Sequence, residues 1–155
     1  WRGALTGELG EVASGIQRRQ WTVDGQMFLP ISRRSTISGR VRAQGVDQNG
    51  GVPETAVIRL GGAQSLRGYH QETFWGTKAG WLNLEWRWLL GPRTRVCAFI
   101  DAGRVWGFGA NVWPVAYGVG LLANGRVGAV GIDYGLSRGE SLGQGMIHMR
   151  MIGEF

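Results

Sequence analysis

The chain has 155 residues and a formal net charge of +6, with 28 glycines, eight tryptophans and one cysteine. This length suits one domain and is short for two, and a lone cysteine excludes an internal disulfide. The scattered arginines, the lack of a nucleic-acid-binding motif and the lack of any run of roughly eighteen apolar residues argue against nucleic-acid-binding and helical membrane proteins.

Apolar and polar residues alternate along most of the chain, which is typical of β-strands with one apolar and one polar face. The clearest segment is 82–88, where every second residue is leucine or tryptophan and the residues between are polar or charged. Most of the predicted strands exceed the usual five or six residues and are long enough to cross a bilayer at a tilt. The eight predicted strands are 2–13, 16–30, 35–46, 77–90, 94–106, 114–124, 126–137 and 144–155.

The predicted connections fall into two classes of length. Short links lie at 32–34, 91–93 and 124–125, and the last of these, Asn-Gly, is a strong hairpin turn. Strict alternation of short and long links predicts that short turns share one edge of the sheet and long loops the other, as in outer-membrane barrels. The long links are 47–76, 107–113 and 138–143.

The alternation alone is compatible with two classes of all-β protein. A soluble sandwich or a lipocalin-like barrel also alternates, with its apolar face inward. A transmembrane antiparallel β-barrel is favoured by an apparent aromatic girdle, formed by Trp86 and Trp88 with Trp75, Trp106 and Trp113 near strand ends. It is also favoured by polar-face charges of both signs, which suit a lumen: Asp24, Arg40, Arg42, Glu85, Arg87, Asp101, Asp133 and Arg150.

The longest predicted loop contains the sequence Leu-Gly-Gly-Ala-Gln-Ser-Leu-Arg-Gly-Tyr at 60–69. Gly61, Gly62 and Gly68 permit positive φ, which a loop folding back on itself needs. The loop arginine, Arg67, requires an acidic partner if it is buried. Glu85 and Asp101 are candidate partners; the alternative is an exposed loop arginine.

Segment 60–69 resembles the signature loop of the BamA/TamA superfamily, the outer-membrane assembly-factor barrels that include bacterial surface antigens. Three further segments follow in that family's order and spacing: 83–88, the Phe-x-Asp-x-Gly segment 99–103, and the terminal strand 145–155. The resemblance covers the chain from about residue 14 to its end, and the preceding residues more weakly.

The resemblance implies a sixteen-stranded barrel preceded by periplasmic POTRA domains. The eight strands would then be the C-terminal half of that barrel, with residues 1–155 forming one domain and the loop 47–76 folding inward. The sequence begins at Trp1 and has no signal peptide, so we expect a fragment or a processed product. A short relative that closes its own eight-stranded barrel is the alternative.

The resemblance also implies which loop residues matter. In the family the loop folds back into the barrel, and its arginine pairs with acidic groups on the inner wall of the next two strands. Carried over, Arg67 pairs with Asp101 and secondarily with Glu85. The other signature residues are Gly61, Gly62, Leu66, Gly68 and Tyr69.

The end of the chain resembles the β-signal that the family's assembly machinery recognises during insertion. The sequence ends at Phe155 without a polar tail, and apolar residues alternate with polar ones from 147 to 151. An ordinary amphipathic closing strand is the alternative. The residues concerned are Gly145, Ile147, Met149, Met151 and Phe155.

The implied function is insertion, assembly or translocation of other polypeptides, without covalent chemistry, cofactor or metal. His70 and His148 have no cysteine, serine or carboxylate at catalytic or metal-ligand spacing. The implied partners are outer-membrane lipids, unfolded outer-membrane or secreted polypeptide clients, and POTRA domains and accessory lipoproteins outside this chain, but no nucleic acid. The implied location is the bacterial outer membrane or an organelle outer envelope, with the C-terminus periplasmic.

Three related functions remain open at this point. A two-partner secretion pore would have a helical plug and two POTRA domains upstream. A barrel anchor of a patatin-like lipid hydrolase would have a Gly-x-Ser-x-Gly motif upstream, and this chain contains none. A purely structural anchor is the third.

Overall fold

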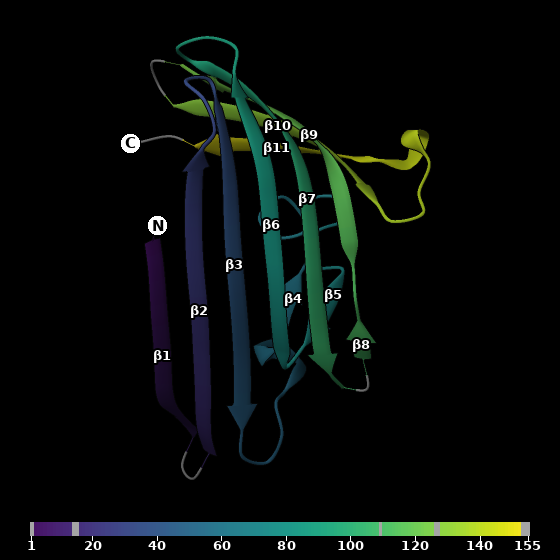
Figure 1. Cartoon of the computed structure of the whole chain (residues 1–155). Helices are drawn as coiled ribbons and strands as arrows, with labels where there is room; N and C mark the ends of the chain where they lie inside the picture. The colour runs from purple at the N-terminus through teal and green to yellow at the C-terminus, as the bar shows by residue number, and fades with distance from the viewer. Residues whose placement is uncertain (1, 14–15, 109, 126–127, 153–155) are drawn as a thin grey trace.

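The structure, a computed structural model, describes residues 2–13, 16–108, 110–125 and 128–152. Eight long strands form one antiparallel sheet in the order β1-β2-β3-β6-β7-β9-β10-β11 (Figure 1). The eight strands predicted from the alternation are therefore confirmed. Their bounds are β1 (Arg2–Ala13), β2 (Ile16–Pro30), β3 (Ser35–Gln48), β6 (Lys78–Leu89), β7 (Thr94–Gly107), β9 (Val115–Asn124), β10 (Ala129–Ser137) and β11 (Met146–Ile152).

The smaller elements lie in the connections. Within the long loop between β3 and β6, β4 (Ile58–Leu60) and β5 (Phe74–Gly76) pair as a separate two-stranded sheet, which the alternation of the sequence does not predict. The short strand β8 (Ala110–Val112) pairs with the end of β7, and there are two 3-10 turns, η1 (Glu54–Ala56) and η2 (Leu142–Gln144). No helix in the described part of the chain is long and apolar enough to cross a membrane, a finding that concerns helices alone.

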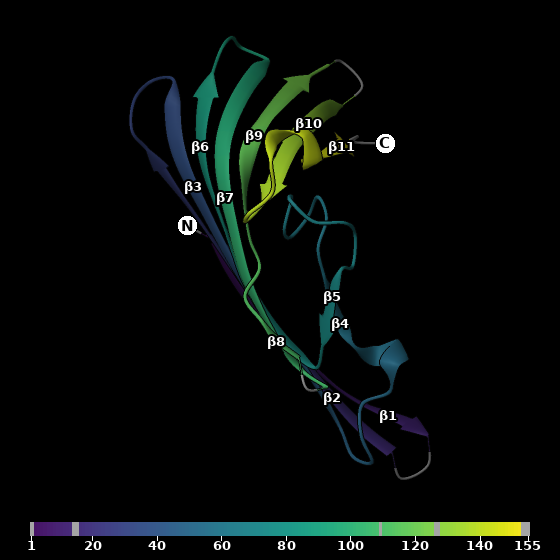
Figure 2. The same ribbon diagram turned by 90° about the vertical axis from the view of Figure 1, so that its right-hand side faces the viewer.

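The large sheet is curved and open. Figure 2 shows it as a trough, with β9, β10 and β11 turning over at one end and β4 and β5 on the concave side. Among the described residues, β1 pairs only with β2, and β11 pairs only with β10. Each outer strand therefore has one unpaired edge.

The two edges where the strands are connected differ in loop length. Tight turns join β2 to β3, β6 to β7 and β9 to β10, whereas longer segments leave β3, β7 and β10 at the opposite edge. The β1–β2 connection departs from this pattern, because Ala13 and Ile16 are register partners. A short link thus lies at the long-loop edge, and the predicted strict alternation begins only at β2–β3.

The convex face of the sheet is apolar and exposed. Large side chains such as Ile100 and Val119 are 55% and 58% exposed there. The concave face carries the charges, and Asp24 pairs with both Arg40 and Arg42 across β2 and β3. A soluble sandwich would bury its apolar face, so this arrangement contradicts that alternative.

Four of the five tryptophans of the expected girdle lie on or beside the large sheet. Trp86, Trp88 and Trp106 lie on its convex face, and Trp113 follows β8 with 64% exposure. Trp75 instead belongs to β5, where its ring packs on Phe108 with the centroids 5.5 Å apart. The girdle expectation was wrong for Trp75, because its three-residue strand is too short to show the periodicity that would mark a separate hairpin.

Candidate functional site

The loop between β3 and β6 is attached to the concave wall by a small apolar core. Leu60 and Leu66 are 1% and 0% exposed, and they pack with Trp81 and Val105 of the wall. Gly103 of β7 leaves room for both leucines, because a Cβ there would lie 3.1 Å from Leu60 and 3.3 Å from Leu66. The loop therefore has a fixed position on the sheet.

The turn that presents the arginine depends on two of the three predicted glycines for its backbone shape. Gly61 and Gly62 have φ of +123° and +91°, a region that favours glycine. The Gly61 N–H donates to Ser65 Oγ at 2.9 Å, and the Gly62 N–H donates to the Leu66 carbonyl at 3.1 Å. The expectation of positive φ did not hold for Gly68, whose φ lies outside that region.

Arg67 is 2% exposed and lies against fully buried Asp101 of β7. Its Nε and one terminal nitrogen donate to the two oxygens of Asp101, each at 2.8 Å, and its backbone N–H adds a third bond at 3.1 Å. The other terminal nitrogen donates to Glu85 Oε1 of β6 at 2.5 Å. A bidentate guanidinium–carboxylate pair with a second carboxylate fixes both the charge and the orientation of the loop.

Three neighbours complete the site around the arginine. Phe99 of β7 lies under the guanidinium, with Cζ of Arg67 3.6 Å from the ring centroid. Asn83 donates to Asp101 Oδ1 at 2.8 Å and to the Ser65 carbonyl at 2.6 Å. Arg87 donates to Glu85 Oε2 at 2.7 Å. Asn83 was not expected in this role, although the alternation had placed it on the polar face.

The charge balance around Arg67 keeps the guanidinium ionised. Burial lowers the pKa of Arg67, but the hydrogen bonds and negative charges of Asp101 and Glu85 outweigh burial and raise that pKa above its usual value. The site therefore holds a permanent cation between two carboxylates. This arrangement docks the loop by charge.

A glycine on β10 lets the loop approach the sheet closely. A Cβ at Gly135 would fall on the backbone carbonyl of Arg67. A Cβ at Gly118 of β9 would instead meet the Tyr134 carbonyl and the Phe99 ring, so Gly118 serves packing within the sheet. A Cβ at Gly68 would lie 2.6 Å from the carbonyl carbon of Leu136. Gly68 thus serves close approach, and the loop touches four neighbouring strands of the wall.

The last residue of the signature segment extends this contact. The Tyr69 hydroxyl donates to the Val115 carbonyl at 3.1 Å, at the start of β9. Its ring meets Phe74 of β5 edge-on, with the centroids 4.9 Å apart. Tyr69 thereby ties the β4–β5 hairpin to the sheet.

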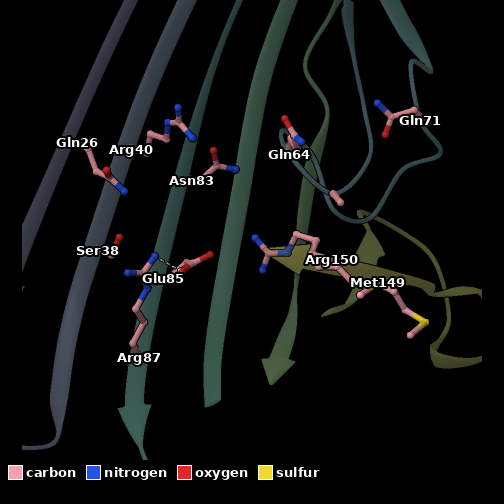
Figure 3. A pocket seen from close by; sticks show the side chains of 12 residues that line it. Gln26, Ser38, Arg40, Gln64, Gln71, Asn83, Glu85, Arg87, Met149 and Arg150 are labelled. Atoms are coloured by element: carbon pink, nitrogen blue, oxygen red, sulfur yellow. Dashed lines mark hydrogen bonds and ion pairs between the residues drawn. The ribbon is translucent and has the colours of Figure 1, made fainter. Parts of the chain in front are cut away.

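A polar pocket of about 590 Å³ lies between the loop tip, the wall and β11 (Figure 3). Arg40 and Glu85 belong to the wall side, and Gln64 belongs to the loop. On the far side the lining is the consecutive run 149–151 of β11. Because successive strand residues point to opposite faces, three in a row can line a pocket only where it meets the strand at its edge. The unpaired edge of β11 therefore faces this pocket.

The C-terminal residues singled out by sequence lie on or beside β11. Ile147, Met149 and Met151 alternate with inward residues and are 68%, 70% and 85% exposed. Gly145 precedes the strand, and a Cβ there would clash with the Tyr134 ring. Phe155, the final residue of the predicted β-signal, lies outside the described residues.

The two histidines lie apart from any candidate catalytic or metal site. His70 is in the loop, where its carbonyl accepts a hydrogen bond from Thr73 at 2.8 Å. His148 is on the inward face of β11, opposite Asp133 in the register. Within the described ranges, no three His, Cys, Asp or Glu side chains are grouped to hold a metal ion.

The sequence matches no protein-family model and no curated protein. Its structure is similar to the crystal structure of BamA from Haemophilus ducreyi lacking POTRA domains 1–3, with a TM-score of 0.74 and 15% sequence identity. The similarity covers 96% of this chain and 36% of that chain. The chain therefore has a BamA-like barrel fold and spans about a third of the length of the BamA chain it matches.

Replacing Arg67 with alanine leaves Asp101 without a cation and leaves Glu85 with Arg87 alone. We expect a loss of about 3–5 kcal/mol in the free energy of unfolding, because removal of one partner leaves a buried charge unpaired. Arg67→Lys should recover only part of this, since an ammonium cannot bridge both carboxylates in the same geometry. Denaturant unfolding and protease sensitivity of the loop 47–76 measure the effect.

The matched control is Arg59→Ala in the same loop, where the pair with Glu72 spans 3.5 Å and both side chains are about half exposed. Loss of this exposed pair should cost less than about 1 kcal/mol. Equal stability losses for the Arg67 and Arg59 variants would contradict the anchoring role of Arg67.

Replacing Gly135 with alanine should displace the loop although every charge is kept. The added methyl would overlap the Arg67 carbonyl, and a steric conflict of this kind typically costs about 1–3 kcal/mol. Gly131→Ala on the same face of β10 is the control, because the nearest atom to its Cβ would be the flexible end of Leu122, at 3.1 Å, and none of the nearest atoms within 4 Å belongs to the loop. Loop proteolysis should rise in the Gly135 variant alone; similar rates in both variants would refute the close-approach argument.

Proposed function

We propose that this chain is part of an outer-membrane β-barrel that inserts, assembles or translocates other polypeptides. The support is a BamA-like fold with an exposed apolar convex face and a charged concave face. The strands β2, β3, β6 and β7 have 15, 14, 12 and 14 residues, enough to cross a bilayer at a tilt. On this proposal the convex face meets lipid and the concave face lines the lumen.

The observation that carries the function is the unpaired edge of β11 facing a polar pocket. An unpaired strand edge presents free N–H and C=O groups along one side, and an extended segment can pair with them by β-augmentation. The pocket would accept the inward side chains of that segment beside Gln64 and Glu85. The client would thus be held by main-chain hydrogen bonds, which suits recognition of many sequences.

The loop carrying Arg67 has a structural role in this proposal. It fills the concave side beside the pocket, and Ala63, Gln64 and Gln71 form the loop's share of the lining. Docking through Arg67 holds these residues opposite β11. The loop thereby sets the width of the space in which a client strand is received.

The proposed partners and orientation follow from the same assignment. Clients are unfolded outer-membrane or secreted polypeptides, and POTRA domains and accessory lipoproteins would lie outside this chain. The short turns and the C-terminus would be periplasmic and the long loops external, in the manner of outer-membrane barrels. The chain would act without a cofactor and without covalent chemistry.

Client contact at the β11 edge can be tested by photo-crosslinking. A photoreactive amino acid at Met149, which lines the pocket, should give several-fold more client adduct than the same group at Met27 on the convex face of β2. Both methionines are exposed, at 70% and 55%, so accessibility is matched. Equal adduct yields, or none at Met149 during active assembly, would contradict the proposal.

Arg67→Ala should lower both the Met149 adduct and growth complementation, whereas Arg59→Ala should not.

The proposed β-signal can be tested separately by deletion of Phe155. We expect the deletion to lower the fraction of chain that reaches the outer membrane in heat-modifiable form, because the terminal aromatic residue is removed from the recognised strand. Phe155→Tyr should retain insertion. Insertion of the deletion variant at the wild-type level would rule out a signal role for this residue.

A further inference from the structure

An apolar groove of about 720 Å³ lies on the convex face, on the other side of the sheet from the Arg67 loop. One wall is formed by Trp86 and Trp88, whose ring centroids are 5.2 Å apart. The Trp86 Nε1–H donates to Ser35 Oγ at 2.7 Å, which fixes the orientation of that ring. The wall is therefore formed before any ligand arrives.

The hollow itself results from one small residue in a row of large ones. The strand register places Trp86 beside Ala98, Ala98 beside Val119, and Val119 beside Tyr134. Ala98 presents only a methyl group between the indole and the isopropyl group. The groove thus crosses four strands, and its lining is almost entirely apolar.

The edge of the sheet next to this groove is basic. Arg33, Arg34 and Arg93 lie in the short turns and are exposed, and none has an ion-pair partner among the described residues. No aspartate or glutamate occurs in the three short turns or in the four residues on either side of them. Arg126 belongs to the third turn in the sequence but lies outside the described residues.

Two of these arginines lie directly beyond the groove. The Arg34 carbonyl accepts from Leu89 N–H at 2.8 Å, and the Arg93 carbonyl accepts from Asn124 N–H at 2.7 Å. Arg34 is thus next to the residue that follows Trp88. At about 3.3 Å per strand residue, the Cα atoms of Arg34 and Arg93 lie within roughly 10 Å of the nearest groove residues, Trp88 and Val96.

The opposite edge differs because acidic residues lie among its basic ones. There Arg59 pairs with Glu72 at 3.5 Å, and Lys78 lies 3.9 Å from Asp47, although Arg104 and Arg138 have no ion pair among the described residues. The short-turn edge, beside the groove, has arginines with no acidic residue near them in the sequence. An apolar groove that opens toward unpaired guanidinium groups fits a molecule with an acyl chain and an anionic head.

We propose that this groove binds one anionic glycerophospholipid. An acyl chain lies along Trp86, Trp88 and Ala98, and the phosphate is bound by Arg93 and Arg34, since guanidinium groups bind phosphate oxygens bidentately. The site rests on the proposed function, because it requires the convex face to lie in a bilayer. The proposal adds a specific lipid to that function and places this lipid in the membrane leaflet beside the short turns.

The test uses the chain with any sequence that flanks it in its gene, folded in detergent and examined by native mass spectrometry. The probes are phosphatidylglycerol and phosphatidylcholine with identical acyl chains. We expect at least about tenfold preference for one phosphatidylglycerol, because each arginine near a membrane surface contributes about fivefold to attraction of an anionic head. Replacement of Arg33, Arg34 and Arg93 by glutamine should remove the preference, whereas Ala98→Phe should reduce retention of both lipids.

The controls are Arg138→Gln at the long-loop edge and Ala102→Phe on the same face of β7, neither of which lies at the groove. The proposed site would be overturned by an unchanged preference for phosphatidylglycerol in the triple variant or by unchanged lipid retention in Ala98→Phe. It would also be overturned if two copies of the chain formed a dimer with no bound lipid. Heat-modifiable migration and insertion into vesicles are measured on the same samples. Insertion without lipid preference refutes the lipid site alone, and failure of the wild type to insert refutes the membrane proposal with it.

Discussion

A buried guanidinium between two carboxylates is the interaction on which the rest of this structure depends. Arg67 is 2% exposed, and a charge so far from water is tolerated only when it is paired and hydrogen-bonded. That requirement fixes Asp101 and Glu85 on neighbouring strands and on the concave face. The loop, the strand register and the division of the sheet into a charged and an apolar side are all consistent with this one pairing.

The same division explains how one sheet supports two kinds of contact. The convex side is mainly apolar across β2 to β10, with charged residues such as Lys78 and Arg104 only toward its long-loop end, so it favours an apolar medium. The concave side holds charges in pairs, so it can face water or a polypeptide without exposing uncompensated acidic groups at Asp24 or Asp133. The exposed edge of β11 lies where these two environments meet.

Much of the fold could be predicted from sequence because the alternation has a period of two and the strands are long. The Arg67 pairing could also be anticipated, since Asp101 and Glu85 fall on the polar face by that period and lie in segments resembling a known family. The β4–β5 hairpin could not, because three-residue strands carry too little periodicity. Nor could the steric role of Gly135, which depends on β10 passing beside a loop some seventy residues earlier in the chain.

Attraction and room for the loop are supplied by different strands. Asp101 and Glu85 of β7 and β6 attract the arginine, whereas Gly135 of β10 leaves the space that the loop backbone occupies. The two requirements can therefore be lost independently during divergence. A relative that kept both carboxylates but carried a side chain at the position of Gly135 would retain the charge pattern and exclude the loop. Glycine at that position thus indicates a docked loop in a way that the charges alone do not.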